Sequence, residues 1–139
     1  MSSWDARKRE EKGRESAMDG IPSSLPALLL ALKVQKRASG VGFDWSGGPE
    51  VAYTDVEDEL AEVRADPSEH EVGDLLFAAV QVARRLDVDP ESALREAVAR
   101  YTTRFRVVEQ LAAAEGIDLA AAGENRLGAL WNEAKRRED

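Results

Sequence analysis

Apolar side chains recur along most of this chain at the three- and four-residue spacing that gathers them on one side of an α-helix. The longest such stripe runs from Leu94 through Phe105 to Leu111. No segment predicts a strand with any strength, so the expected fold class is all-α. Helices are predicted over residues 25–38, 51–65, 69–86, 90–115 and 124–136.

Residues that favour helix ends mark the limits of several of these segments. Ser68 is a typical N-cap, and Glu71 follows it at the capping-box position. Asp89 followed by Pro90 predicts another helix start, and Gly116 predicts the end of the same helix. The sequence therefore predicts a bundle of about five helices.

Two segments fall outside the helical pattern. Residues 1–20 are polar and highly charged, which predicts a flexible N-terminal arm ahead of a single domain over residues 21–137. Residues 39–50 are rich in glycine and predict a loop. The apolar side chains of Val41, Phe43 and Trp45 are expected to be tucked under this loop.

Composition and charge narrow the functional classes. The formal net charge of −8 argues against a nucleic-acid partner, because there is no excess of cations to neutralise phosphates. The chain has no cysteine and one histidine, His70, which excludes thiolate and multi-histidine metal sites within one chain. It has neither an apolar run long enough to span a bilayer nor an apolar secretion signal, so we expect no membrane partner and a cytoplasmic location.

Four acidic residues on two neighbouring predicted helices form the strongest candidate for a functional site. Glu59 and Glu62 stand three residues apart, as do Glu71 and Asp74, so each pair shares one helix face. Two carboxylates about 5 Å apart repel by roughly 3 kcal/mol at an effective dielectric constant near 20. If the two helices pack side by side, a hard divalent cation, Mg²⁺ first among them, would stabilise the cluster, and Mg²⁺ suggests phosphate chemistry.

Each candidate residue also has a plain structural explanation. Glu71 could be a capping-box acid alone, although this leaves Asp74 unexplained on an otherwise apolar helix face. Glu59 and Glu62 could belong to a solvated acidic face. Six further residues are candidates for substrate contacts, and each is also compatible with an ordinary surface or packing role. They are Lys33, Lys36, Gln81, Arg100, Arg104 and Trp131.

The acidic pairs belong to a longer series of spaced blocks. The sequence reads Asp58-Glu59-x-x-Glu62 and then Glu71-x-x-Asp74, with further blocks at 20–27, 33–38, 41–45, 73–78, 83–86 and 104–106. In this order the blocks resemble the C-terminal domain of two-domain bacterial proteins of the MazG family of nucleoside triphosphate pyrophosphohydrolases. The likeness covers residues 4–137, and the family motif is E-E-x-x-E followed by E-x-x-D.

This resemblance implies a fold, an activity and a set of site residues. The expected fold is a MazG-like helical bundle completed by dimerisation, as a homodimer or a higher homo-oligomer. The expected reaction is hydrolysis of a nucleoside triphosphate between the α- and β-phosphates to a nucleoside monophosphate and pyrophosphate, with Mg²⁺ or alternatively Mn²⁺. By position in the motif, Glu59, Glu62, Glu71 and Asp74 are the implied metal ligands, and Asp58 or Glu59 would orient or deprotonate the attacking water.

The same resemblance bears on the substrate contacts. Arg100 and Arg104 match basic positions associated with the phosphates, and Trp131 matches an aromatic residue near the base. Gln81 and Val98 stand where asparagine is common in the family, and Val98 has no side-chain group that could hydrogen-bond.

The departures from the family pattern keep other functions open. Asp58 replaces the first glutamate of the motif, and only residues 63–70 separate its two halves. A second hypothesis is therefore a catalytically weak helical dimer that acts as a nucleotide-binding or protein-interaction module. A third keeps the enzyme but narrows it to a house-cleaning role on deoxyuridine or damaged nucleotides.

Overall fold

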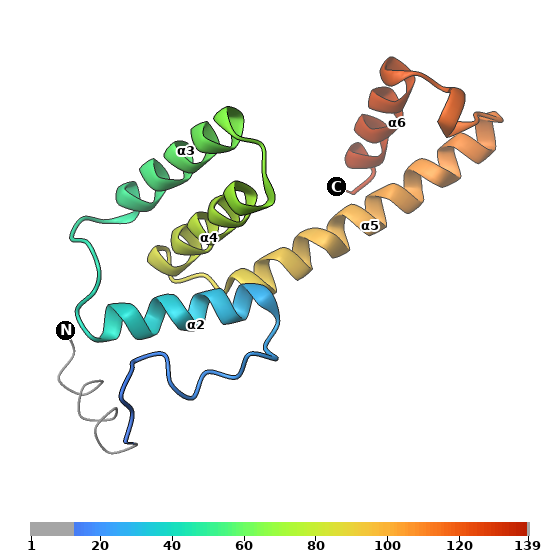
Figure 1. The fold of residues 1–139 in the computed structure, drawn as a ribbon. Coiled ribbons are helices and arrows are strands. Elements are labelled where there is room, and N and C mark those ends of the chain that lie inside the picture. Colours follow the sequence, from blue (N-terminus) through green and yellow to red (C-terminus); the bar gives the residue numbers. More distant parts are fainter. Residues whose placement is uncertain (1–12, 139) are drawn as a thin grey trace. The chain divides into compact units, whose positions relative to one another are not determined.

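A computed structural model describes residues 13–138, and within this range it contains helices and connecting turns but no strand. The five α-helices of the described residues confirm the all-α prediction, and each overlaps one predicted segment (Figure 1). They are α2 (Ala27–Gly40), α3 (Pro49–Ala65), α4 (Glu69–Arg85), α5 (Pro90–Glu115) and α6 (Glu124–Arg136), with a short 3-10 helix η1 (Leu119–Ala121) before the last.

The predicted helix ends are confirmed by hydrogen bonds that backbone N–H groups donate. The backbone N–H of Glu71 donates to the Ser68 hydroxyl at 3.2 Å, which caps α4. At the start of α5, the N–H of Glu91 donates to Oδ1 of Asp89 at 2.9 Å. At its end, Gly116 has a φ of +68°, and the N–H of the following residue, Ile117, reaches back to the carbonyl of Ala112 at 2.8 Å.

The described chain divides into two compact units, one ending at Ala93 and the other beginning at Leu94. In the first unit, α3 and α4 lie side by side, and α2 packs against α4 (Figure 1). Gln35 of α2 is buried, and its Nε2 donates to the backbone carbonyl of Phe77 in α4 at 2.9 Å. This bond fixes α2 against the helix that carries Asp74.

The second unit contains most of α5, η1 and α6. Its core is formed by Val108, Ala112, Leu130 and Ala134, which join α5 to α6. These four residues recur at helical spacing on each helix, so the apolar stripe read from the sequence accounts for the packing.

The polar arm predicted at residues 1–20 lies mostly outside the described residues. Within the described part, one guanidinium nitrogen of Arg37 donates to the carbonyls of Ala17 and Asp19, at 2.9 and 3.0 Å. These contacts tie residues 17–19 to α2. Each helix in residues 13–138 is too short or too polar to cross a membrane.

The expectation that the aromatic side chains of the glycine-rich loop are covered was wrong. Phe43 and Trp45 are 66% and 62% exposed, whereas Val41 is half-buried. The physical reason is Asp44, which stands between the two aromatic residues in the sequence. Its carboxylate forms ion pairs with Arg84 and Arg85 at the end of α4, and both rings remain exposed to solvent.

Candidate functional site

Acidic side chains of α3 and α4 lie close enough to influence one another electrostatically. Partial burial raises the pKa of Glu59 above its ordinary value, and the negative charges of Asp74, Glu71 and Glu62 raise it further. All four acids predicted as metal ligands therefore belong to one cluster of like charge. In the first unit, helix pairing produces the convergence that the sequence pattern could only suggest.

A pocket of about 570 Å³ opens beside this cluster. Two of the acids, Glu59 and Asp74, contribute to its wall. The other lining residues come from the glycine-rich loop, from α3 and from α4, and they are Trp45, Val51, Asp55, Phe77, Ala78 and Gln81. The pocket thus combines carboxylates, an amide and aromatic rings in a single hollow.

The donor set suits a hard divalent cation. Ligand atoms of His70, Glu71 and Asp74 lie within 4.8 Å of one another, and Nε2 of His70 lies 3.4 Å from Oδ2 of Asp74. Carboxylate oxygens are the ligands that Mg²⁺ and Mn²⁺ prefer. Partial burial and then the surrounding negative charge raise the pKa of Glu59, and a cation would offset that charge. The residues present therefore fit the metal that the sequence pattern implies.

The glycine-rich loop is fastened to the end of α4 by a single carboxylate. Arg84 donates to both oxygens of Asp44 at 3.0 and 3.1 Å, and Arg85 donates to Oδ1 at 2.8 Å. The Ser39 hydroxyl adds a bond at 2.9 Å. The hydrogen bond from Arg84 is the main reason that the pKa of Asp44 falls from 3.8 to about 2. The loop is thus held by charge-assisted bonds on one side of the pocket.

Arg84 also orients the amide of Gln81. Its Nε donates to Oε1 of Gln81 at 2.7 Å, which occupies the amide oxygen. The Nε2 group of Gln81 then remains as the donor on a residue that lines the pocket. Of the predicted substrate contacts, Gln81 is the one that the structure places beside the acids.

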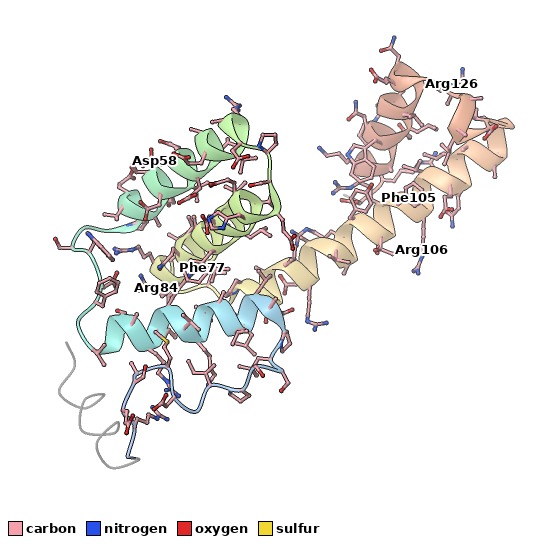
Figure 2. The ribbon with its side chains drawn as sticks, in the orientation of Figure 1. Asp58, Phe77, Arg84, Phe105, Arg106 and Arg126 are labelled. Carbon is pink, nitrogen blue, oxygen red and sulfur yellow. The ribbon has the colours of Figure 1, made fainter. Side chains whose placement is uncertain are left out.

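The other candidates of the first unit lie away from that pocket. Asp58 is exposed on α3 and is not part of the pocket lining (Figure 2). Lys33 is exposed on α2. Lys36 lines a different hollow, together with Arg84 and Asp89.

The remaining candidates belong to the second unit. The guanidinium of Arg104 donates to both carboxylate oxygens of Glu138, at 2.6 and 2.8 Å, and lies 4.9 Å above the ring of Trp131. Trp131 is half-buried and packs against Tyr101, with ring centroids 5.1 Å apart. Arg100 is exposed on α5. Their participation in substrate binding stays a prediction.

Sequence reasoning assigned no role to several residues that border the site. Asp55 lies four residues before Glu59, so helical spacing alone could have placed it on the same face. Trp45 carried no comparable signal, because its position depends on hydrogen bonds that Arg84 and Arg85, some 40 residues away, donate to Asp44.

Comparisons with known proteins confirm the family resemblance read from the sequence. A protein of Escherichia coli K12 named nucleoside triphosphate pyrophosphohydrolase is 40% identical over 149 residues, which cover 99% of this chain and 57% of that protein. A Thermotoga maritima protein named nucleoside triphosphate pyrophosphohydrolase/pyrophosphatase MazG is 41% identical over 138 residues, covering 95% and 54%. A Mycolicibacterium smegmatis protein bearing the pyrophosphohydrolase name is 30% identical over 145 residues, covering 94% and 36%. The chain spans about half the length of the first two relatives, and no family model matches it.

Proposed function

Because this chain belongs to the MazG family, we propose that it hydrolyses nucleoside triphosphates between the α- and β-phosphates, releasing a nucleoside monophosphate and pyrophosphate. The observation that carries the proposal is the cluster of four acids on α3 and α4 beside an open pocket. Carboxylates gathered in this way repel one another, and a bound cation would offset the repulsion.

The proposed cofactor is Mg²⁺, with Mn²⁺ as an alternative. Glu59, Glu62, Glu71 and Asp74 would hold it. The charges of the last three act on Glu59, and ligand atoms of Glu71 and Asp74 lie within 4.8 Å of each other. When bound, the cation would neutralise phosphate charge and polarise the phosphorus that is attacked.

The side chains of the first unit have separate proposed roles. Glu59 would orient or deprotonate the attacking water through a carboxylate oxygen that the cation leaves free, because it lines the pocket. Asp58, the other candidate for this role, is exposed on α3 outside the pocket lining, which favours Glu59. Gln81 would donate from Nε2 to an oxygen of the substrate.

The remaining substrate contacts are proposed on position in the family pattern alone. Arg100 and Arg104 would bind phosphates, and Trp131 would lie near the base. Lys33 and Lys36 are further cationic candidates, both exposed on α2.

We also propose that the chain assembles as a homodimer or a larger homo-oligomer. Large apolar side chains are exposed in both units, among them Leu76 at 56%, Val98 at 57% and Tyr101 at 60%. Among the described residues, no large side chain is fully buried. Light scattering on the purified protein should therefore give at least twice the 15.2 kDa mass of one chain, and Leu76→Asp should lower that mass or weaken the assembly.

The central experiment measures pyrophosphate release from a panel of ribo- and deoxyribonucleoside triphosphates, with and without Mg²⁺. The panel includes deoxyuridine and damaged-base triphosphates, so it also ranks substrates for a house-cleaning role. Metal-dependent release by the unaltered protein, lost in Glu71→Ala, would support the proposal.

Glu69→Ala is the matched control for that variant. Glu69 is an exposed acid in the same first turn of α4, outside the cluster that raises the pKa of Glu59. It should retain turnover. If folded, oligomeric protein released no pyrophosphate from any triphosphate, the chain would be a binding module instead.

A further inference from the structure

An exposed indole stands at the wall of the acidic pocket. Trp45 is 62% exposed, yet it lines the same hollow as Glu59 and Asp74. An exposed tryptophan presents a large, rigid apolar surface that can bind a partner or a ligand.

The backbone of Trp45 is held on both sides. Its N–H donates to Oδ1 of Asp44 at 3.0 Å, and its carbonyl accepts from Arg85 at 2.8 Å. Arg85 also donates to the carbonyl of Gly47 at 2.7 Å. The ring is therefore presented by a fixed segment rather than by a loose one, so little ordering entropy would be lost when a ligand meets it.

Close packing of the loop adds to this rigidity. Gly47 has a φ of +109°, and a Cβ at that position would lie 2.9 Å from Cγ2 of Val51 in α3. The ring of Phe43 meets that of Trp45 edge-on, with centroids 5.1 Å apart and planes at 76°. The indole is thus in contact with a second ring of the same loop.

A nucleoside triphosphate contains a group that the indole of Trp45 could bind, namely its base. In a nucleoside triphosphate, a planar base is joined through a sugar to the phosphates that the acid cluster would bind through its cation. Stacking a base on an aromatic side chain is favourable for every base, because each base has a π-face. Trp45 offers such a face next to the carboxylates.

We infer that Trp45 stacks against the base of the bound nucleoside triphosphate, and that Asp44, together with Arg84 and Arg85, acts as a positioning residue for it. This inference rests on the proposed function, because it takes a nucleotide as the ligand. It extends that function by assigning a base contact to the glycine-rich loop of the first unit. Trp131, by comparison, is half-buried and is covered by Arg104 and Tyr101.

The first test compares Trp45→Ala with Trp45→Phe in steady-state hydrolysis. With nucleoside triphosphates, KM should rise about 5- to 100-fold in the alanine variant while kcat stays within about twofold, since base stacking is a uniform binding interaction. Trp45→Phe keeps a ring and should recover most of the loss. Ribose 5-triphosphate, which has no base, is the internal control, and its KM should be the same in all three proteins.

The second test follows the ring directly. In a protein with Trp4→Phe and Trp131→Phe, Trp45 is the sole tryptophan. A nucleotide added with Ca²⁺ should quench its fluorescence. Introducing Asp44→Asn should shift the quenching midpoint to higher nucleotide concentration, and Asp44→Glu should recover part of the shift, because it restores the negative charge that Arg84 and Arg85 bind.

The outcomes separate this inference from the proposed function. Hydrolysis with an unchanged KM in Trp45→Ala would overturn the stacking role and leave the enzyme intact. Nucleotide quenching of Trp45 without hydrolysis would support the stacking role and overturn the enzyme. If the unaltered protein neither hydrolysed nor bound nucleotides, both would be wrong.

Discussion

The two units of this chain differ in how many of their carboxylates are paired with arginine side chains. In the second unit, acids are matched with arginines: Glu138 binds Arg104, and Glu133 binds Arg136 and Arg137. In the first unit, both Arg84 and Arg85 bind the one carboxylate of Asp44. Among residues 13–138, no lysine or arginine lies within ion-pair distance of the acids on the facing sides of α3 and α4.

This difference in pairing affects the electrostatic free energy of the two units. Matched pairs on a surface contribute little but cost little. An unmatched cluster of acids is unfavourable in the bare protein, so its presence points to a ligand of opposite charge. The first unit therefore carries the proposed chemistry, whereas the second offers a small apolar core and exposed apolar surface.

The largest expected effect is the loss of turnover when an acid of the cluster is neutralised. Asp74→Asn keeps the size of the side chain and removes its charge. Pyrophosphate release should fall by more than about 100-fold, since changes even beyond the direct ligands of a metal commonly cost 10- to 100-fold. Titration of Mn²⁺ in the absence of nucleotide should show weaker binding.

Glu69→Gln is the control for this change, because the same loss of one negative charge occurs one turn away in α4. It should leave Mn²⁺ affinity and turnover within about twofold. Equal effects of the two substitutions would mean that net charge matters and the cluster does not.

The next largest effect concerns the core of the second unit. Leu130 is 6% exposed in the cluster between α5 and α6, whereas Leu127, one turn earlier, is 39% exposed. Leu130→Ala should lower the free energy of unfolding by about 2–5 kcal/mol. Urea denaturation checks this value.

Leu127→Ala should cost less than about 1 kcal/mol at low protein concentration, since much of its side chain is already in water. If Leu127 lies in a contact between copies of the chain, its cost should grow with protein concentration. A concentration-independent loss as large as that of Leu130→Ala would contradict the described core.

Local signals in the sequence were enough for the helices and their ends. Ser68, Asp89 and Gly116 act through hydrogen bonds to residues within five positions, so their roles could be read directly. The pairing of Glu59 with Asp74 required one further step, the assumption that two helices joined by a short turn pack side by side.

The loop environment could not be read in this way. Exposure of Trp45 follows from bonds between Asp44 and residues about 40 positions later. Aromatic side chains are usually buried to a large extent. This general rule gave the wrong expectation for Phe43 and Trp45. Similarly, the partner of Arg104 is Glu138, 34 positions away, which helical spacing does not indicate.

A smaller effect is expected from the carboxylate that fastens the loop. Because the pKa of Asp44 is lowered to about 2, its contribution to stability is fully present above pH 3.8 and is lost as the pH falls from 3.8 towards 2. Asp44→Asn should therefore lower the free energy of unfolding by about 1.5–3 kcal/mol at pH 7, the range for hydrogen bonds to charged groups.

Denaturation at several pH values checks the sign of this effect. The difference between the unaltered protein and Asp44→Asn should shrink as the pH falls from 4 to 2. Asp87→Asn is a suitable control, because Asp87 is an exposed acid two residues beyond Arg85. A difference that stayed constant over this pH range would show that the charge of Asp44 contributes nothing.

The smallest expected effect concerns the ion pair between Arg104 and Glu138 in the second unit. If Arg104 binds substrate phosphates, it must leave the carboxylate of Glu138, which now accepts two of its hydrogen bonds. Glu138→Gln would hold the guanidinium less firmly, so KM for a nucleoside triphosphate should fall by up to about fivefold at constant kcat. Added salt should reduce the advantage by weakening the native pair. An unchanged KM would assign Arg104 to the internal charge pairing of the second unit and leave phosphate binding to other residues.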